Sequence, residues 1–309
     1  MTMASRCRLE EDFFEDLQII FWILKDTFWA LLFPALSILF GIAATVLQVI
    51  FLRRQWDLLA SRFDNAATLF WISGNFTWMI GETFYEPEDT DINLGNTPAI
   101  EPNIDEYNKF KYGAIAQFSL SVGVLLVFYL CYFRKAYADT PESVDRMLCF
   151  PTLKAYEDTH TIFWVFKDFF WALELGPLAV ISALLTISIG VHVLVLRYRQ
   201  SFREFWNALC LVLWITGSAT WMIGELYEND KGRRAAASFY ALAVISVITY
   251  GIGKLLQADD PRPANEAAVE LEDVKSAVIS DDGNAIDNED PIGDDDPRLS
   301  EELVTEELL

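Results

Sequence analysis

The chain has 309 residues, 53% of them hydrophobic, and a formal net charge of -22 at neutral pH. This acidic balance, without a basic patch to neutralise phosphates, argues against nucleic-acid binding. Length and hydrophobic content fit a large soluble domain as well as a membrane protein, so the placement of the charges along the chain decides between these classes.

The amino-terminal segment is acidic and has no apolar stretch followed by a cleavage site, so we expect no cleaved signal peptide. Further on, six long segments contain no charged residue: 27–52, 65–81, 112–133, 175–196, 205–224 and 235–253. About 20 apolar residues suffice for a helix to cross the hydrocarbon core, and helices in soluble cores rarely stay uncharged for so long. We therefore predict an all-α polytopic membrane protein in contact with the lipid bilayer. Its six transmembrane helices are expected at about 27–52, 65–84, 112–133, 169–196, 205–227 and 235–255.

Two sequence blocks occur twice, in the same order. Trp22, Lys25, Asp26 and Trp29 return as Trp164, Lys167, Asp168 and Trp171, and Trp71, Trp78 and Glu82 return as Trp214, Trp221 and Glu225. These blocks hold eight of the ten Trp residues, which indicates an internal duplication rather than coincidence. The copies occupy residues 1–135 and 156–257, with a polar connector at 136–155. Because three helices per copy is an odd number, we predict two inverted-topology three-helix repeats, an arrangement familiar from membrane transporters.

An acidic, proline-containing loop at 86–110 separates the second and third predicted helices, and its counterpart in the second copy is much shorter. Such a loop either makes contacts of its own or is a tolerated surface insertion. The sequence does not choose between these two interpretations.

The carboxyl-terminal segment 258–309 carries eighteen Asp or Glu residues against three Lys or Arg residues. This composition cannot bury enough apolar surface to offset chain entropy, so we predict a disordered acidic tail. We expect it to serve as a solvated spacer or to dock a basic partner, cations or another membrane protein. Lys and Arg are nearly balanced between the two membrane sides, so the positive-inside rule gives no orientation, and placing the tail in the cytoplasm is a working assumption.

The second and fifth predicted helices each carry an aromatic and polar stripe at helical spacing. The stripes are Trp71, Asn75, Trp78 and Glu82 in the first copy, and Trp214, Ser218, Trp221 and Glu225 in the second. We expect both helices to lie centrally, with the stripes toward neighbouring helices rather than lipid.

Carboxylates at the edge of a membrane segment mark candidate functional positions, since a charge at a helix centre costs about 2.5 to 3.5 kcal/mol and somewhat less near the interface. We predict ion pairs of Lys25 with Glu82 and of Lys167 with Glu225. These pairs either join two helices within a repeat or act as gates or proton-binding sites at opposite mouths of a pathway. The predicted pathway residues are Glu82, Glu225, Asn75, Ser218, Lys25, Asp26, Lys167 and Asp168.

Pro34 and Pro177 occupy matching positions in the first predicted helix of each copy. Since proline removes a backbone donor, we predict a kink in both helices. Trp22 and Trp29 flank the Lys25-Asp26 pair, and we interpret them as an aromatic belt at the membrane interface rather than a ligand-stacking box.

The sequence contains no nucleophile elbow, phosphate-binding glycine loop, zinc-binding helix motif or cysteine framework. Of the two histidines, only His192 falls within a predicted span, so a bis-histidine haem between spanning helices is excluded. We therefore expect no enzymatic activity, no catalytic residues, no metal and no cofactor.

These features favour a secondary transporter or channel for a small solute or ion. The alternative is a non-catalytic membrane scaffold or assembly partner that binds another membrane protein through its Trp/Gly/Glu stripe. A cavity shared by the second and fifth helices would favour transport, whereas stripes that are packed shut or turned to lipid would favour a scaffold. The sequence does not name the solute, the membrane or the oligomeric state.

Overall fold

A computed structural model describes residues 3–85, 103–137, 150–198, 202–228 and 231–258. Contacts divide the chain into Met1–Gly253 and Lys254–Leu309, and the helical bundle belongs to the first unit. Almost all of the 258–309 tail and most of the 86–110 loop lie outside the described residues, so the predictions made for them stay predictions.

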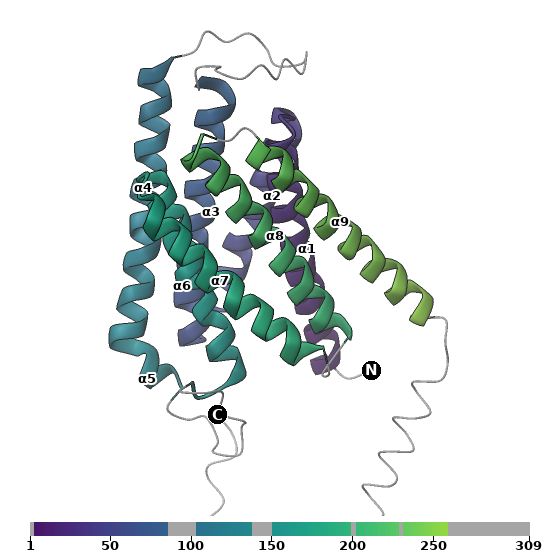
Figure 1. Cartoon of the computed structure of the whole chain (residues 1–309). Helices are drawn as coiled ribbons and strands as arrows, with labels where there is room; N and C mark the ends of the chain where they lie inside the picture. Colours follow the sequence, from purple (N-terminus) through teal and green to yellow (C-terminus); the bar gives the residue numbers. More distant parts are fainter. Residues whose placement is uncertain (1–2, 86–102, 138–149, 199–201, 229–230, 259–309) are drawn as a thin grey trace, which may run out of the picture. The chain divides into compact units, whose positions relative to one another are not determined.

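Eight helices of 20 residues or more run through the described chain (Figure 1). They are α1 Met3–Ala30, α2 Pro34–Arg54, α3 Leu59–Tyr85, α4 Ile104–Val127, α6 Leu153–Ala172, α7 Gly176–Arg197, α8 Phe202–Leu226 and α9 Lys231–Ala258. A π-helical turn, η1 Phe128–Tyr132, continues α4 into the short α5 Phe133–Ala136. Each copy therefore contributes four long helices, α1 to α4 and α6 to α9, where the sequence analysis predicted three.

The additional helix of each copy arises from a chain reversal inside the first predicted span. After α1, Leu32 adopts a left-handed backbone with a φ of 58°. The Phe33 N–H donates to the Phe28 carbonyl at 2.8 Å, which closes the helix in the manner of a Schellman motif. Glu174 repeats this left-handed turn after α6, with a φ of 59°. The charge-free run 27–52 is therefore the end of one helix, a turn and then α2.

Pro34 and Pro177 lie in the first two positions of α2 and α7. Proline is favoured there because the first amides of a helix have no intrahelical acceptor and the proline φ already suits a helix. The residue before a proline is also biased away from helical geometry, which helps to end the preceding segment. The predicted kinks are therefore wrong, because each proline begins a helix.

The eight helices differ in what surrounds them. α1, α3, α6 and α8 carry the eight duplicated Trp residues, and all eight are buried. α2, α4, α7 and α9 instead expose large apolar side chains, among them Leu39, Leu120, Leu184 and Ile245. Apolar side chains at such positions face lipid, whereas helices covered by protein can hold polar groups. The first four are here called the inner helices and the other four the outer helices.

Five helices are long and apolar enough to cross a membrane: α2, α4 with its continuation to Ala136, α7, α8 and α9. They correspond to five of the six predicted spans, and together they identify a multi-pass integral membrane protein. The sixth prediction, α3, is an inner helix, which is consistent with the polar residues that dilute its sequence.

The two copies run in the same direction along the bundle. Trp22 contacts its counterpart Trp164 at a ring-centroid distance of 5.6 Å. Two helical turns further on, Trp29 and Trp171 both lie against Trp221, at 4.7 and 6.1 Å. In an inverted pair these later residues would lie on opposite sides of the first contact. The predicted inverted topology is therefore wrong, because four helices per copy, an even number, return the chain to its starting side and relate the copies by an axis along the bundle.

Candidate functional site

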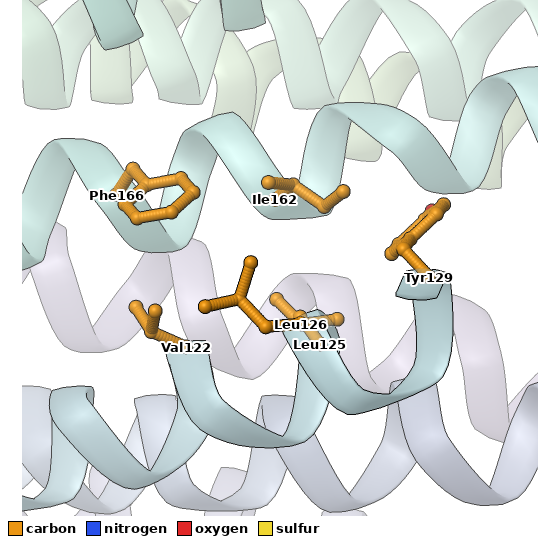
Figure 2. Close-up of a pocket in the computed structure, with 6 residues that line it drawn as sticks. All are labelled: Val122, Leu125, Leu126, Tyr129, Ile162 and Phe166. Carbon is orange, nitrogen blue, oxygen red and sulfur yellow. The ribbon is translucent and has the colours of Figure 1, made fainter. Parts of the chain in front are cut away.

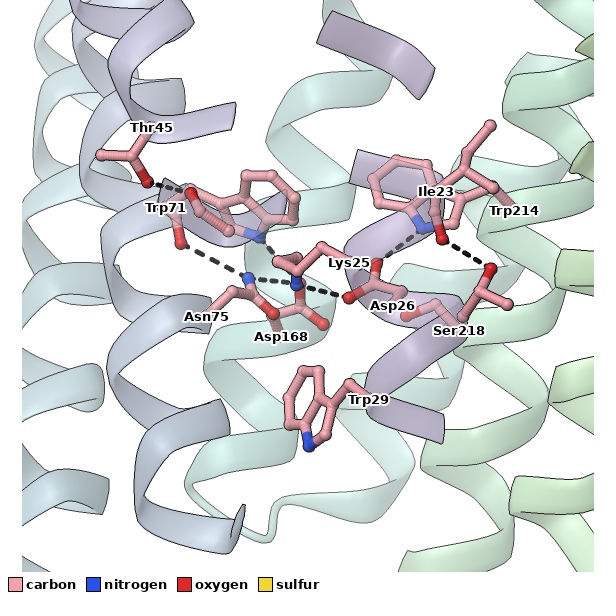
Figure 3. A network of polar contacts seen from close by, with 12 residues as sticks. Ile23, Lys25, Asp26, Trp29, Thr45, Trp71, Asn75, Asp168, Trp214 and Ser218 are labelled. Atoms are coloured by element: carbon pink, nitrogen blue, oxygen red, sulfur yellow. Dashed lines mark hydrogen bonds and ion pairs between the residues drawn. The ribbon is translucent and has the colours of Figure 1, made fainter. Parts of the chain in front are cut away.

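Two lysine-aspartate ion pairs lie buried among the inner helices. Figure 3 shows the first of them, Lys25 with Asp26, and the aspartate of the second, Asp168. Lys25 pairs with Asp26 on α1, and Lys167 pairs with Asp168 on α6. The lysine side chains are 1% and 0% exposed, and the aspartate side chains are 9% and 3% exposed. Four charged groups therefore occupy equivalent positions in a bundle whose outer helices are apolar. Ionisable residues inside a membrane protein are costly, and they commonly mark ion or proton pathways.

Each aspartate is bound by a tryptophan of the other copy. Trp214 Nε1 on α8 donates to Asp26 Oδ2 at 2.7 Å, and Trp71 Nε1 on α3 donates to Asp168 Oδ2 at 2.7 Å. In both carboxylates the remaining oxygen accepts from the neighbouring lysine. Hydrogen bonds to an ionised acceptor are stronger than neutral ones, so this reciprocal pattern ties the two copies together.

Two layers of four tryptophan rings lie on either side of the charged pairs along the inner helices. One layer is Trp22, Trp71, Trp164 and Trp214, and the other is Trp29, Trp78, Trp171 and Trp221. Within the layers, edge-on contacts join Trp71 to Trp164 at 4.3 Å and Trp78 to Trp171 at 4.7 Å. Because Trp22 and Trp29 are buried, their interpretation as an interfacial belt is wrong.

The lysine ammonium groups also lie over rings of the second layer. Lys25 Nζ is 5.0 Å from the Trp29 ring centroid, and Lys167 Nζ is 5.2 Å from that of Trp171. A cation over an indole face is stabilised by the ring quadrupole, most strongly where water is excluded. Each ammonium group therefore contacts one carboxylate and one aromatic face.

Asn75 and Ser218, the two polar stripe residues, both contact the Lys167-Asp168 pair. Asn75 Nδ2 donates to Asp168 Oδ2 at 3.3 Å, and Lys167 Nζ donates to the Ser218 hydroxyl at 2.8 Å. The duplicated positions therefore make different contacts in the two copies. The Lys167-Asp168 pair has the richer set of polar partners among the described residues.

The outer helices that pack against α3 and α8 also differ between the two copies. A Cβ atom added to Gly74 would lie 2.7 Å from the Phe118 ring of α4, and one added to Gly217 would lie 2.7 Å from the Tyr240 ring of α9. The Tyr240 hydroxyl lies near Ser218. An aromatic ring thus packs against the glycine in both copies, and the second copy adds a hydroxyl group.

Neither Glu82 nor Glu225 forms the lysine pair predicted for it, because each lysine binds the aspartate beside it. Lys167 contacts Ser218, which precedes Glu225 by seven residues. Glu225 therefore lies about 10.5 Å further along α8 than the residue that Lys167 binds. Since α3 and α8 run in the same direction, both glutamates lie at the same end of the bundle. The prediction that they occupy opposite mouths of a pathway is therefore wrong.

One acidic residue near the start of α3 was missed by the sequence analysis. Asp64 lies outside the charge-free segment and near the Thr161 hydroxyl on α6. Burial, reinforced by the Asp158 carboxylate, raises the pKa of Asp64 to about 7, while Lys154 and Thr161 act in the opposite direction. Asp64 precedes Trp71 by seven residues, so extending the helical stripe backwards by two turns would have found it.

A small apolar pocket lies between α4 and α6, away from the charged pairs (Figure 2). Its lining residues are Val122, Leu125, Leu126, Tyr129, Ile162 and Phe166. Because none of the predicted pathway residues lines it, this pocket is not part of the charged centre.

Comparison of the chain with family models, curated proteins and solved structures gave no match. Within the described residues, no group of three or more His, Cys, Asp or Glu side chains is arranged to hold a metal ion. Function is therefore inferred from the buried pairs and their partners.

Proposed function

We propose that the protein is a secondary transporter that couples the movement of a small solute or ion to proton binding at the two lysine-aspartate pairs. The observation that carries this proposal is the presence of both pairs, almost fully buried, where the two copies meet. In transporters built from parallel repeats, the axis that relates the two repeats lies along the membrane normal. Their binding sites commonly lie near the midplane between the repeats. The proposed activity is non-catalytic.

In this proposal all eight long helices cross the bilayer. α1 runs antiparallel to the apolar α2: the Arg54 guanidinium lies 4.7 Å from the Phe14 ring, and a Cβ atom on Gly41 would lie 3.6 Å from the Lys25 side chain. α1 therefore lies at the same depth as α2, and its lower hydropathy is tolerated because protein covers it. Eight crossings, an even number, would place the start of α1 and the end of α9 on the same side of the membrane.

Proton binding would change how the two copies are held together. Protonation of Asp168 would remove the counter-charge of the buried Lys167 ammonium, and an unpaired buried charge is strongly destabilising. It would also weaken the hydrogen bond from Trp71, which belongs to the other copy. Proton binding would thus loosen the contact between the two copies. A looser contact would allow the copies to rock against each other, as alternating access requires.

The scaffold alternative has less support. A partner bound through the Trp stripe would need access to residues such as Trp78 and Trp214, which are 4% and 2% exposed. A stripe packed shut was expected of a scaffold, but a purely structural core is usually as stable or more stable with apolar residues in place of buried ion pairs. The close packing of the rings instead suits a closed state of a transporter.

Reconstitution into vesicles tests the proposal. Proton flux driven by an imposed pH gradient would be compared for wild type, Asp26→Asn, Asp168→Asn and empty vesicles. Asparagine keeps the shape and can still accept from the indole, but it cannot exchange a proton, so we expect each variant to lose about tenfold or more of the flux. Gly123→Ala is a matched control, since nothing lies within 4 Å of the added Cβ atom. Equal rates in wild-type and empty vesicles would refute proton coupling.

A further inference from the structure

We infer that protons reach Asp168 along the contact between α3 and α6, from Asp64 past Thr68 and Asn75, and that the equivalent contact between α8 and α1 conducts none. This inference rests on the proposed function and assigns its proton route to one of two similar interfaces.

α3 presents an unbroken row of polar and aromatic groups on one face. Helical spacing aligns Asp64, Thr68, Trp71, Asn75, Trp78 and Glu82. This face meets α6 at three levels: Asp64 lies by Thr161, Trp71 and Asn75 bind Asp168, and Trp78 packs on Trp171 at 4.7 Å. Thr68 is 7% exposed and lies between the first two levels. The row thus leads from the end of the bundle to the buried carboxylate.

The matching row on α8 is interrupted. Its members are Asn207, Leu211, Trp214, Ser218, Trp221 and Glu225. A threonine hydroxyl can donate and accept at once, which proton transfer along a chain of groups requires, whereas Leu211 can do neither. Asn207, in the position of Asp64, carries an amide that does not titrate at physiological pH. The α8 row therefore lacks both the proton acceptor at the end of the bundle and the next polar group.

An indole donor further along the α3 row differs from its counterpart on the α8 row, while Trp29 Nε1 of α1 is likewise without an acceptor in the described part of the chain. Trp221 Nε1 donates to Glu225, whereas Trp78 Nε1 has no acceptor in the described part of the chain, although the residue is 4% exposed. A buried donor without a partner is destabilising, and such groups commonly bind ordered water. The α3 row thus offers a site for a small polar ligand one turn beyond Asn75, where the α8 row has a completed hydrogen bond.

The surroundings of Asp64 suit exchange of protons with the aqueous phase. Its titratable and charged neighbours come from α6 and from the chain at η1 and α5: Lys154, Asp158, Tyr129 and Tyr137. The Lys154 side chain is 72% exposed and binds Asp158 at 2.7 Å, so the cluster reaches the surface. With a pKa of about 7, the Asp64 carboxyl gains and loses its proton near neutral pH.

The destination of the route also differs from its counterpart. Asp168 is bound by Asn75, a member of the α3 row, and its lysine partner is bound by Ser218. Among the described side chains, Asp26 accepts hydrogen bonds from Lys25 and Trp214. The α3 row thus ends at the Lys167-Asp168 pair, whose additional polar contacts can respond when Asp168 gains or loses a proton.

Proton flux into pyranine-loaded vesicles, with valinomycin and potassium to clamp the voltage, tests this route. The test variants are Asp64→Asn and Thr68→Leu, the second of which introduces the residue that α8 has at this position. The matched controls on α8 are Asn207→Ala and Leu211→Val. We expect each test variant to lower the flux by at least about fivefold and each control to stay within about twofold of wild type. Size-exclusion profiles establish folding, and Thr68→Val replaces Thr68→Leu if the larger side chain is not tolerated.

The outcomes separate the route from the function on which it rests. A wild-type rate equal to that of empty vesicles contradicts the proposed function itself. A wild-type flux that Asp168→Asn abolishes, but that Asp64→Asn and Thr68→Leu leave unchanged, overturns the route alone. The same conclusion follows if Asn207→Ala lowers the flux as much as Asp64→Asn does.

Discussion

The α3–α6 contact and the α8–α1 contact share their middle and differ toward one end. In the middle, each has an indole N–H bound to an aspartate of the other copy at 2.7 Å. Two turns away, α3 has Asp64 where α8 has Asn207, and Thr68 precedes Trp71 where Leu211 precedes Trp214. The bonds that join the copies are thus present twice, while the titratable group occurs once. In a duplicated bundle, the symmetric part holds the halves together, and the asymmetric part can acquire a function of its own.

The largest effect on stability is expected from removing one lysine. Lys167→Met would leave Asp168 buried without its cation and should lower the free energy of unfolding by about 3–5 kcal/mol. Lys25→Met should cost somewhat less, because the Asp26 side chain is 9% exposed against 3% for Asp168. Unfolding in detergent measures both. The double variant Lys167→Met/Asp168→Leu should recover part of the loss, and a loss below about 1 kcal/mol in both single variants would contradict the burial of the pairs.

The indole donors should come next. Trp71→Phe removes the hydrogen bond to Asp168 and should cost about 1.5–3 kcal/mol, the range for a bond to a charged group. Trp214→Phe should cost a similar amount, since its bond to Asp26 has the same length. Trp78→Phe is the control, because Trp78 has no acceptor among the described residues and loses no such bond. Equal losses at Trp71 and Trp78, measured by the same unfolding assay, would argue against the cross-copy bonds.

Helix packing should give smaller effects of similar size in the two copies. Gly74→Ala and Gly217→Ala each place a methyl group 2.7 Å from an aromatic ring, and overpacking of this kind costs about 1–3 kcal/mol. Gly123→Ala, with nothing within 4 Å, should be neutral or stabilising by about 0.5–1 kcal/mol. Thermal unfolding midpoints would rank the three variants. A stabilising Gly74→Ala would mean that α4 lies further from α3 than described.

The smallest expected effect is the pH dependence that Asp64 contributes. Its pKa of about 7 in the folded protein exceeds the ordinary value of 3.8, so the folded state holds an extra proton between these values. The free energy of unfolding should therefore fall as the pH rises from about 4 to about 7, by roughly 1 kcal/mol because the cluster lies near water. Asp64→Asn should flatten this slope, and Asn207→Ala should leave it unchanged. Unfolding curves at pH 5 and pH 8 make the comparison, and identical slopes in wild type and Asp64→Asn would contradict the raised pKa.

Hydropathy located the five helices that are long and apolar enough to cross a membrane, because a spanning helix must be apolar over most of its length. α2, α4, α7, α8 and α9 were all expected near their observed places. α1 and most of α6 were not predicted as long helices of the bundle, because charges such as Lys25 and Asp26 interrupt their apolar sequence, and a helix covered by protein can carry such charges. That omission gave each copy an odd number of helices, and the inverted topology followed from it.

The sequence by itself determined the duplication, the apolar outer helices and the inward-facing Trp stripes, because periodicity and repetition are properties of the chain alone. Only the tertiary structure decided the partners of the buried charges. The Trp71 bond to Asp168 spans 97 residues and the Trp214 bond to Asp26 spans 188, and no local pattern specifies contacts at such separations. The direction of the copies was decided by the left-handed turns at Leu32 and Glu174, which reverse the chain within runs that hydropathy alone reads as uninterrupted.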